Sequence, residues 1–188
     1  MTITRYSVSG PTLTYRAGLF VRSFNLNVRL LLIILLAGSP LIVQAIEPGK
    51  PAPSCDLKKL SDNEVVRLSV PGKVSYVDFW ASWCGPCTES IPFLNEIQQQ
   101  YQAQGLDVIG INLDENREDA ESFLIKHPAA ITIAQNADGQ CPALFGVQAM
   151  PSSYLIDRKG KIRHVQLGFH TAETVEIHQK IQALLNEK

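Results

Sequence analysis

The sequence has 188 residues, of which 45% are hydrophobic, and its formal net charge is −1. This length and this apolar content are enough for one domain with a packed core, so a scaffold of disulfides is not needed. The nearly equal numbers of basic (17) and acidic (18) side chains argue against the strongly basic surface typical of nucleic-acid binding. We therefore expect one folded domain and no nucleic-acid partner.

The first 45 residues have the features of an export signal. The most apolar stretch, residues 30–43 (LLLIILLAGSPLIV), directly follows a basic side chain and is preceded by no acidic residue. It is shorter than the about 20 residues of a membrane-spanning helix, and it fits the apolar region of a signal peptide. We expect cleavage after about Ala45, and an uncleaved membrane anchor is the alternative. A true start of translation near Leu26 or Val28 would account for the long basic region.

Residues 46–188 are expected to form the exported domain, in the periplasm or at the outer face of the cytoplasmic membrane. Only the N-terminal segment would touch the membrane. After a proline-rich lead-in, runs rich in β-branched and aromatic residues predict strands at residues 57–60, 65–70, 73–79, 106–113, 130–134, 153–157 and 162–167. Apolar periodicity and stop signals predict helices at residues 86–102, 117–126, 139–145 and 172–186.

The order of these elements predicts the fold class. After the N-terminal hairpin, strands and helices follow each other as β–α–β–α–β–α–β–β–α. Such alternation predicts an α/β fold with a central sheet that is covered by helices on both faces. The last two strands are joined by a tight turn at residues 158–160, so the sheet should be mixed and not purely parallel.

The segment that carries the chemistry is WASWCGPC, residues 80–87, which contains Cys84 and Cys87. A Cys-x-x-Cys pair that follows a strand and opens a helix indicates redox chemistry. Near a helix N-terminus, unpaired N–H groups and the helix dipole stabilise a thiolate, and the thiolate is the species that attacks a disulfide. We expect Cys84 to attack a partner disulfide and Cys87 to resolve the mixed disulfide. A zinc site would need a second pair of Cys or His residues at ligand spacing, and the sequence has none. We expect no metal, and no cofactor beyond the redox-active pair itself.

The surrounding residues resemble the thioredoxin superfamily. VDFWASWCGPC, at residues 77–87, is similar to the thioredoxin active-site segment, and Pro92 matches the proline that kinks the active-site helix. Met150 and Pro151 precede a strand, as the cis-proline of that superfamily does. The resemblance covers nearly all of residues 46–188 and implies a thioredoxin fold.

Three features are similar to the exported TlpA/ResA-type thiol–disulfide oxidoreductases. They are the export signal, the lead-in PGKPAPSCDLKKL with its N-terminal hairpin, and an inserted helix and strand at residues 112–134. This subtype implies a protein-disulfide reductase that takes electrons from a thiol-reducing donor in the membrane. Its client proteins would be exported proteins with disulfides, with cytochrome c maturation as one pathway. Nothing in the sequence demands more than a monomer.

The resemblance also assigns a role to Asp78, which lies six residues before Cys84. The matching acid of thioredoxins is buried near the resolving cysteine. Desolvation would raise its pKa, and it would accept the proton of Cys87. The alternative is an ordinary polar residue that is exposed at the end of a strand.

Five further residues are expected to form the client-binding surface. Trp83 should be exposed at the rim of the site and contact the partner. Gly85 and Pro86 form the spacer, and Gly-Pro is typical of the reducing members of the superfamily. Met150 and Pro151 match the loop that faces the cysteine pair and holds the client chain by its backbone.

The other two cysteines, Cys55 and Cys141, lie far apart in the sequence. We expect both to be buried free thiols, which pack as small hydrophobic side chains. A second disulfide between them is the alternative, because an exported compartment permits it.

Two other classes of function are weaker alternatives. A copper-handling thioredoxin-like module would use a Cys-x-x-x-Cys pair with a distant histidine, whereas the spacer here has two residues. A peroxidase of the peroxiredoxin type relies on one reactive cysteine that follows a Thr or Ser, with an arginine nearby, and this pattern is absent from the sequence.

Overall fold

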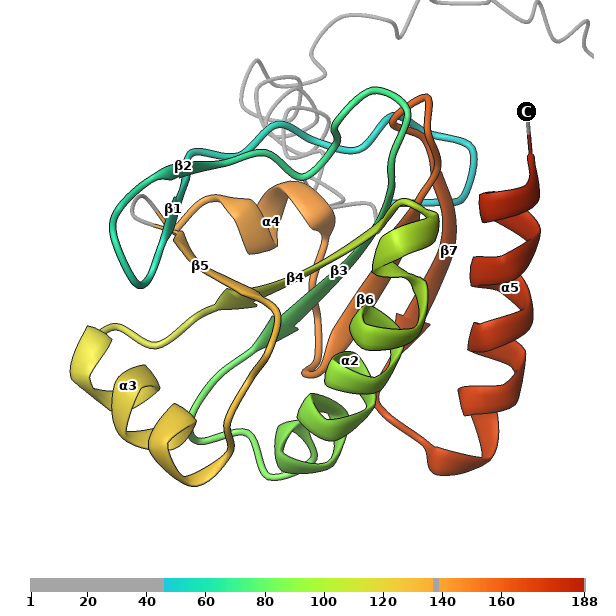
Figure 1. Ribbon diagram of the computed structural model, residues 1–188. Helices are drawn as coiled ribbons and strands as arrows, with labels where there is room; N and C mark the ends of the chain where they lie inside the picture. The colour runs from blue at the N-terminus through green and yellow to red at the C-terminus, as the bar shows by residue number, and fades with distance from the viewer. Residues whose placement is uncertain (1–45, 137–138, 188) are drawn as a thin grey trace, which may run out of the picture. The chain divides into compact units, whose positions relative to one another are not determined.

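A seven-stranded sheet forms the centre of the computed structural model, which describes residues 46–136 and 139–187 (Figure 1). The export signal expected in residues 1–45 lies outside the described residues. The strands are β1 (Leu57–Lys59), β2 (Val65–Val66), β3 (Val74–Trp80), β4 (Leu106–Asn112), β5 (Thr132–Asn136), β6 (Ser152–Ile156) and β7 (Ile162–Leu167). They lie in the order β2-β1-β5-β4-β3-β6-β7. The β3–β4 and β4–β5 pairs are parallel and the other pairs are antiparallel, so the sheet is mixed, as predicted.

Helices cover both faces of this sheet. They are α2 (Cys87–Tyr101), α3 (Arg117–Lys126), α4 (Cys141–Phe145) and α5 (Thr174–Asn186). One apolar cluster joins the sheet to α2, α3 and α5, and a second cluster joins the opposite face to α4 and the N-terminal lead-in. The helices α2 and α5 lie side by side (Figure 1), where the rings of Phe93 and His178 are 5.6 Å apart.

All seven residues of β3 are buried, because helices pack on both of its faces. Side chains alternate between the faces of a strand. Tyr76 and Trp80 therefore pack in the cluster with α2, whereas Val77 and Phe79 pack on the side of α4. Asp78 has the same parity as Tyr76 and Trp80, so its carboxyl group lies in the layer between the sheet and α2.

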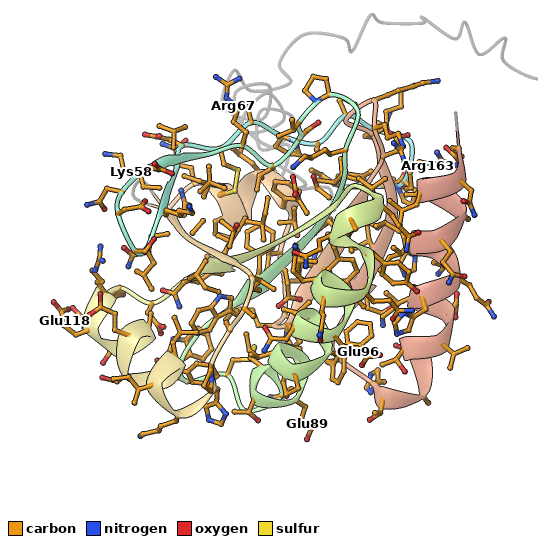
Figure 2. All side chains as sticks on the ribbon, in the orientation of Figure 1. Lys58, Arg67, Glu89, Glu96, Glu118 and Arg163 are labelled. Carbon is orange, nitrogen blue, oxygen red and sulfur yellow. A yellow bond between two sulfur atoms is a disulfide. The ribbon has the colours of Figure 1, made fainter. Side chains whose placement is uncertain are left out.

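The buried position of this carboxyl group is unusual in the molecule. The charged side chains labelled in Figure 2 are all exposed at the periphery of the fold: Lys58, Arg67, Glu89, Glu96, Glu118 and Arg163. The other buried acid of the described residues is Asp157. Asp157 accepts hydrogen bonds from the amides of Lys159 and Lys161, each at 2.9 Å, and forms an ion pair with Arg163. Asp78 has no such ion pair within the described residues.

The predicted strands differ most from the observed ones at β2 and β5, and the other strand ends agree to within one residue. The second hairpin strand ends at Val66 and not at residue 70, because this edge strand pairs only with β1, which has three residues. The strand expected at residues 130–134 begins at Thr132. The side chain of Asn95 on α2 holds the preceding segment, since its Nδ2 donates to the Pro128 carbonyl at 2.9 Å and its Oδ1 accepts from the Ala130 amide at 2.6 Å.

The expectation that Cys55 and Cys141 are free thiols is wrong, because they form a disulfide with a Cα–Cα distance of 5.4 Å. The strand order explains the pairing. Strand β1 pairs with β5, so that Leu57 lies opposite Asn136. Cys55 is two residues before Leu57, and Cys141 follows Asn136 at the start of α4, which brings both cysteines to the same end of the β1–β5 pair. The sequence pattern contains no sign of this long-range pairing.

Candidate active site

The redox pair lies in the loop between β3 and α2. Cys84 and Cys87 form a disulfide with a Cα–Cα distance of 5.4 Å. Two tight turns shape the loop, since the Cys84 amide donates to the Ala81 carbonyl at 3.1 Å and the Cys87 amide donates to the Cys84 carbonyl at 3.2 Å. Cys87 is the first residue of α2 and is fully buried, whereas Cys84 is 5% exposed. Cys84 is therefore the sulfur that another protein can reach.

Asp114 braces this loop from the segment that follows β4. Its carboxylate accepts hydrogen bonds from the Ser82 amide at 2.9 Å, from the Ser82 hydroxyl at 2.8 Å and from the side-chain amide of Asn112 at 2.7 Å. Sequence reasoning missed this contact. A usable signal exists, because the carboxyl ends of neighbouring parallel strands meet at one edge of a sheet, and β3 and β4 are such a pair.

Asp78 is buried, as predicted, with 1% of its surface exposed. Burial raises the pKa of this carboxyl from 3.8 to about 7, and a hydrogen bond from the Ser153 hydroxyl opposes the rise. That hydroxyl donates to Oδ1 of Asp78 at 2.5 Å. The other oxygen, Oδ2, is buried with no hydrogen-bond partner within the described residues. A carboxyl group in this state can hold or release a proton near neutral pH.

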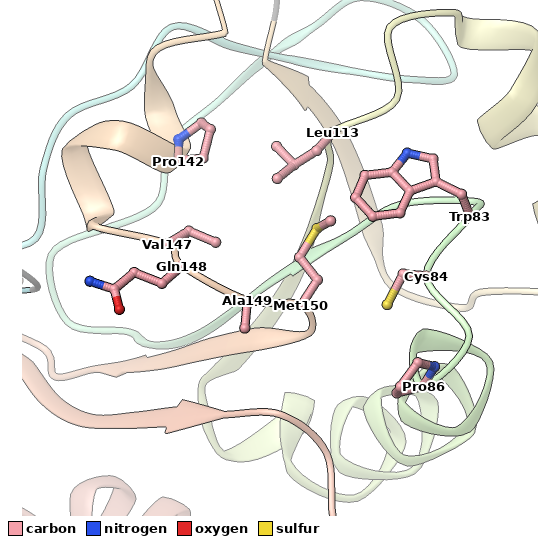
Figure 3. A pocket seen from close by; sticks show the side chains of 9 residues that line it. All are labelled: Trp83, Cys84, Pro86, Leu113, Pro142, Val147, Gln148, Ala149 and Met150. Carbon is pink, nitrogen blue, oxygen red and sulfur yellow. The ribbon is translucent and has the colours of Figure 1, made fainter.

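A cavity of about 620 Å³ opens beside Cys84 (Figure 3). Its lining combines predicted and unpredicted residues: Trp83, Cys84, Pro86, Leu113, Pro142, Val147, Gln148, Ala149 and Met150. None of these nine described residues is charged. In Figure 3, Met150 and Trp83 lie on either side of the opening near the Cys84 sulfur. The cavity is therefore a mainly apolar groove next to the Cys84 sulfur.

The structure brings together most of the predicted client-binding residues. Trp83 is 70% exposed at the rim of the groove, as expected, and Pro86 and Met150 line it. The bond between Met150 and Pro151 is cis, as predicted. Gly85 and Pro151 are outside the lining. Gly85 is exposed in the loop, and Pro151 is buried.

The far wall of the groove is the part that sequence reasoning missed. Leu113 follows β4, Pro142 belongs to α4, and residues 147–149 connect α4 to β6. These segments are distant from the cysteine pair in the sequence, so only the strand order places them beside it. No local motif marks them.

Neither a metal site nor a membrane span is evident in residues 46–136 and 139–187. No group of three or more His, Cys, Asp or Glu residues there is arranged to hold a metal ion. None of the helices described is both long enough and apolar enough to cross a membrane.

Comparisons with known proteins agree with this geometry. The model of the Redoxin family matches residues 47–181. The thiol-disulfide oxidoreductase ResA of Geobacillus thermodenitrificans is 30% identical over 134 residues, which cover 71% of this chain and 77% of that protein. A crystal structure from Chlorobium tepidum, provisionally described as the thiol:disulfide interchange protein DsbE, is 43% identical. It matches with a TM-score of 0.71 over 76% of this chain and 100% of that one.

A solution structure from Bacteroides thetaiotaomicron, provisionally described as a protein disulfide isomerase, is 27% identical. It matches with a TM-score of 0.69 over 76% of this chain and 92% of that one. These likenesses confirm the thioredoxin fold that the sequence predicts. The chain belongs to the Redoxin family and is a thiol–disulfide oxidoreductase of the thioredoxin-like TlpA/ResA type.

Proposed function

We propose that this oxidoreductase reduces disulfides in exported proteins, in the periplasm or at the cell surface. The observation that carries the proposal is the position of Cys84 at the edge of an uncharged groove, with Cys87 buried behind it. A groove of this kind suits an extended apolar segment of a client protein better than a small charged substrate. The Gly85-Pro86 spacer, typical of reducing members, supports the direction of electron flow.

The reaction starts from the reduced pair. The Cys84 thiolate attacks one sulfur of the client disulfide, which forms a mixed disulfide and releases the second client sulfur as a thiolate. The Cys87 thiolate then attacks Cys84 Sγ and releases the first client sulfur. Two electrons and two protons pass to the client, and the protein is left with the Cys84–Cys87 disulfide that the structure shows. A thiol-reducing donor in the membrane returns the protein to the dithiol.

Asp78 is proposed as the proton acceptor for Cys87. A buried thiol reacts slowly until it loses its proton, and the resolving step therefore needs a base inside the protein. The Asp78 carboxyl lies in the layer beneath α2, and its pKa of about 7 leaves both protonation states populated at neutral pH. An ordinary exposed aspartate would be too weak a base for this task.

The same arrangement supports a proposal about the partners. Trp83, Pro86 and Met150 would contact the side chains of the client next to its cysteine, and the backbone at Gly85 and Pro151 would align the client chain. We propose that the clients include proteins of cytochrome c maturation, that the protein acts as a monomer, and that only its N-terminal segment touches the membrane. The redox-active disulfide would be its sole cofactor.

The test is the reduction potential of residues 46–188, measured in glutathione or dithiothreitol buffers with Cys84→Ser as the control. A value of about −270 mV would support a reductant, and a value of about −120 mV would reverse the direction and make the protein a disulfide donor. Cys87→Ser should trap a mixed disulfide with a client peptide, and dithiothreitol should release it. The Cys55–Cys141 disulfide is a second two-electron couple, so it is removed by Cys55→Ala and Cys141→Ala in both proteins. A two-electron couple that persists in Cys84→Ser in this background would refute the assignment of the pair.

A further inference from the structure

Ser153 and Asp78 form a buried polar pair that joins two neighbouring strands. They lie directly opposite each other in the antiparallel β3–β6 ladder. The Ser153 hydroxyl donates to Asp78 Oδ1 at 2.5 Å, and the two residues are 6% and 1% exposed. The other three positions of β6 that pack in the apolar core carry larger side chains, Tyr154, Leu155 and Ile156. Ser153 instead places a small hydroxyl group in the core, and the partner of that hydroxyl is the Asp78 carboxyl.

We propose that Ser153 is a positioning residue, which orients the Asp78 carboxyl and favours its ionised form for proton transfer from Cys87. This inference rests on the proposed function, because it assigns Ser153 a role through the proposed base. The hydrogen bond occupies Oδ1, so that Oδ2, which has no partner within the described residues, is left to take up the proton. A donor hydrogen bond stabilises the charged form of a carboxyl group more than its neutral form.

The groups around Asp78 determine how strongly the Ser153 hydroxyl affects the ionisation of its carboxyl group. Across the parallel β3–β4 pair, Asp78 faces Gly110, which has no side chain. On the same face of the sheet, the titratable groups of the described residues include Tyr76 on β3, the cysteine pair at the start of α2 and Tyr101 of α2. His164 of β7 also lies on this face, opposite Leu155 of β6, and its ring is 3.1 Å from Lys180 Nζ of α5. Tyr101 shares a hydrogen bond of 2.9 Å with His178 of α5.

Tyr76 does not offset the influence of Ser153. Burial raises the pKa of Tyr76, and the negative charge of Asp78 raises it further, so this side chain stays neutral when Asp78 ionises. Asp78 forms no ion pair within the described residues, and Lys180 of α5 contacts His164 instead. Burial and the Ser153 hydroxyl act on the pKa of Asp78 in opposite directions. If the Ser153 hydroxyl is lost, burial should raise the pKa of Asp78 further, because nothing then opposes it.

Loss of the Ser153 hydroxyl should change the pH dependence of the resolving step, and not only the stability of the protein. Ser153→Ala should raise the titration midpoint of Asp78 by about one pH unit, since a hydrogen bond to a charged group contributes about that much. At pH 7 the ionised fraction of Asp78 would fall, and the resolving step would slow several-fold. The rate should recover at higher pH, which a merely structural defect would not allow.

The experiment compares Ser153→Ala with a matched pair, Ser153→Thr and Ser153→Val. Threonine keeps the hydroxyl and valine replaces it with a methyl group of similar size, so the pair separates hydrogen bonding from packing. The Asp78 carboxyl is followed by ¹³C NMR titration of the oxidised protein, and client-disulfide reduction is measured from pH 5 to pH 9 (an experimental range of about four units around the midpoint). In an Asp78→Asn background, Ser153→Ala should leave the pH profile unchanged.

We expect Ser153→Ala and Ser153→Val to raise the midpoint of the Asp78 NMR titration and the midpoint of the pH profile of client reduction. Ser153→Thr should keep both midpoints near the wild-type values. The proposal is overturned if the Asp78 midpoint is the same with and without the hydroxyl, or if threonine and valine shift it equally. The NMR titration does not depend on the client reaction. If the midpoint shifts but Cys84→Ser still reduces the client, the proposed function fails while the coupling of Ser153 to Asp78 stands.

Discussion

Cys55 and Cys141 are joined by a disulfide that ties the N-terminal lead-in to the first residue of α4, across a sequence separation of 86 residues. The next residue, Pro142, lines the groove beside Cys84. Cys141 is fully buried, in a cluster that also contains Phe145. The second disulfide therefore fixes one end of the short helix that contributes to the far wall of the groove.

Replacing both Cys55 and Cys141 with alanine should lower the free energy of unfolding by about 3 kcal/mol, because a cross-link over a long loop restricts the unfolded chain. Guanidinium unfolding of the oxidised proteins at pH 7 measures this loss. The matched control replaces Cys84 and Cys87 with alanine, which opens a loop of only a few residues and should cost less. Equal stability of the Cys55/Cys141 variant and the wild type would contradict the prediction.

The parts of the molecule that the sequence predicted correctly are encoded locally. The run from Val74 to Trp80 is rich in apolar and aromatic residues and forms the buried strand β3. The motif that contains Cys84 and Cys87 follows that strand and opens a helix, as predicted. The burial of Asp78 was an expectation carried by the resemblance, and the structure confirms it.

The parts that were missed depend on strand order and register. The Cys55–Cys141 disulfide requires that β1 pair with β5, and the hydrogen bond of Ser153 to Asp78 requires one particular register between β3 and β6. Hydrophobic periodicity shows which side of a strand is buried, but it does not show which strand is the neighbour. Residues that meet only through such pairing leave no local signal.

Asp78→Asn should stabilise the protein at pH 8 and have little effect at pH 4. The folded protein raises the pKa of Asp78 from 3.8 to about 7, so the stability of the wild type should fall as the pH rises between these values. Below pH 3.8 the carboxyl is protonated in both the folded and the unfolded protein, and above about pH 7 it is ionised in both. This pKa shift lowers the free energy of unfolding of the wild type by on the order of 4 kcal/mol between the low-pH limit and the high-pH limit.

Urea unfolding of the oxidised wild type and of Asp78→Asn at pH 4, 6 and 8 (about two pH units apart, to span the shift) would measure this difference. The difference in the free energy of unfolding between Asp78→Asn and the wild type should increase as the pH rises. Ser153→Ala serves as the control that keeps the carboxyl, and its stability should retain the pH dependence. If this difference in the free energy of unfolding is the same at all three pH values, Asp78 does not titrate in this range.

Asp114→Ala should loosen the loop that precedes Cys84. It removes the acceptor for both the amide and the hydroxyl of Ser82, so we expect a loss of about 2 kcal/mol in the free energy of unfolding. Ser82→Ala removes only the hydroxyl contact and should cost about 1 kcal/mol or less. Denaturant unfolding and the rate of reduction of the Cys84–Cys87 disulfide by dithiothreitol check both effects. If Ser82→Ala is the more damaging change, Asp114 does not brace the loop.

Trp83→Ala should weaken client binding without weakening the fold. The Trp83 side chain is 70% exposed and lines the groove, so its loss should change the free energy of unfolding by less than about 0.5 kcal/mol. An aromatic side chain at the edge of an apolar groove is a typical binding hot spot, and we expect KM for a disulfide-bonded client peptide to rise about tenfold. Val175→Ala is the matched control, because Val175 is 64% exposed on α5 and is not part of the groove lining. Equal KM values for the two variants would show that exposure of Trp83 serves some purpose other than client binding, whereas a rise confined to Trp83→Ala would place the client in the groove beside Cys84.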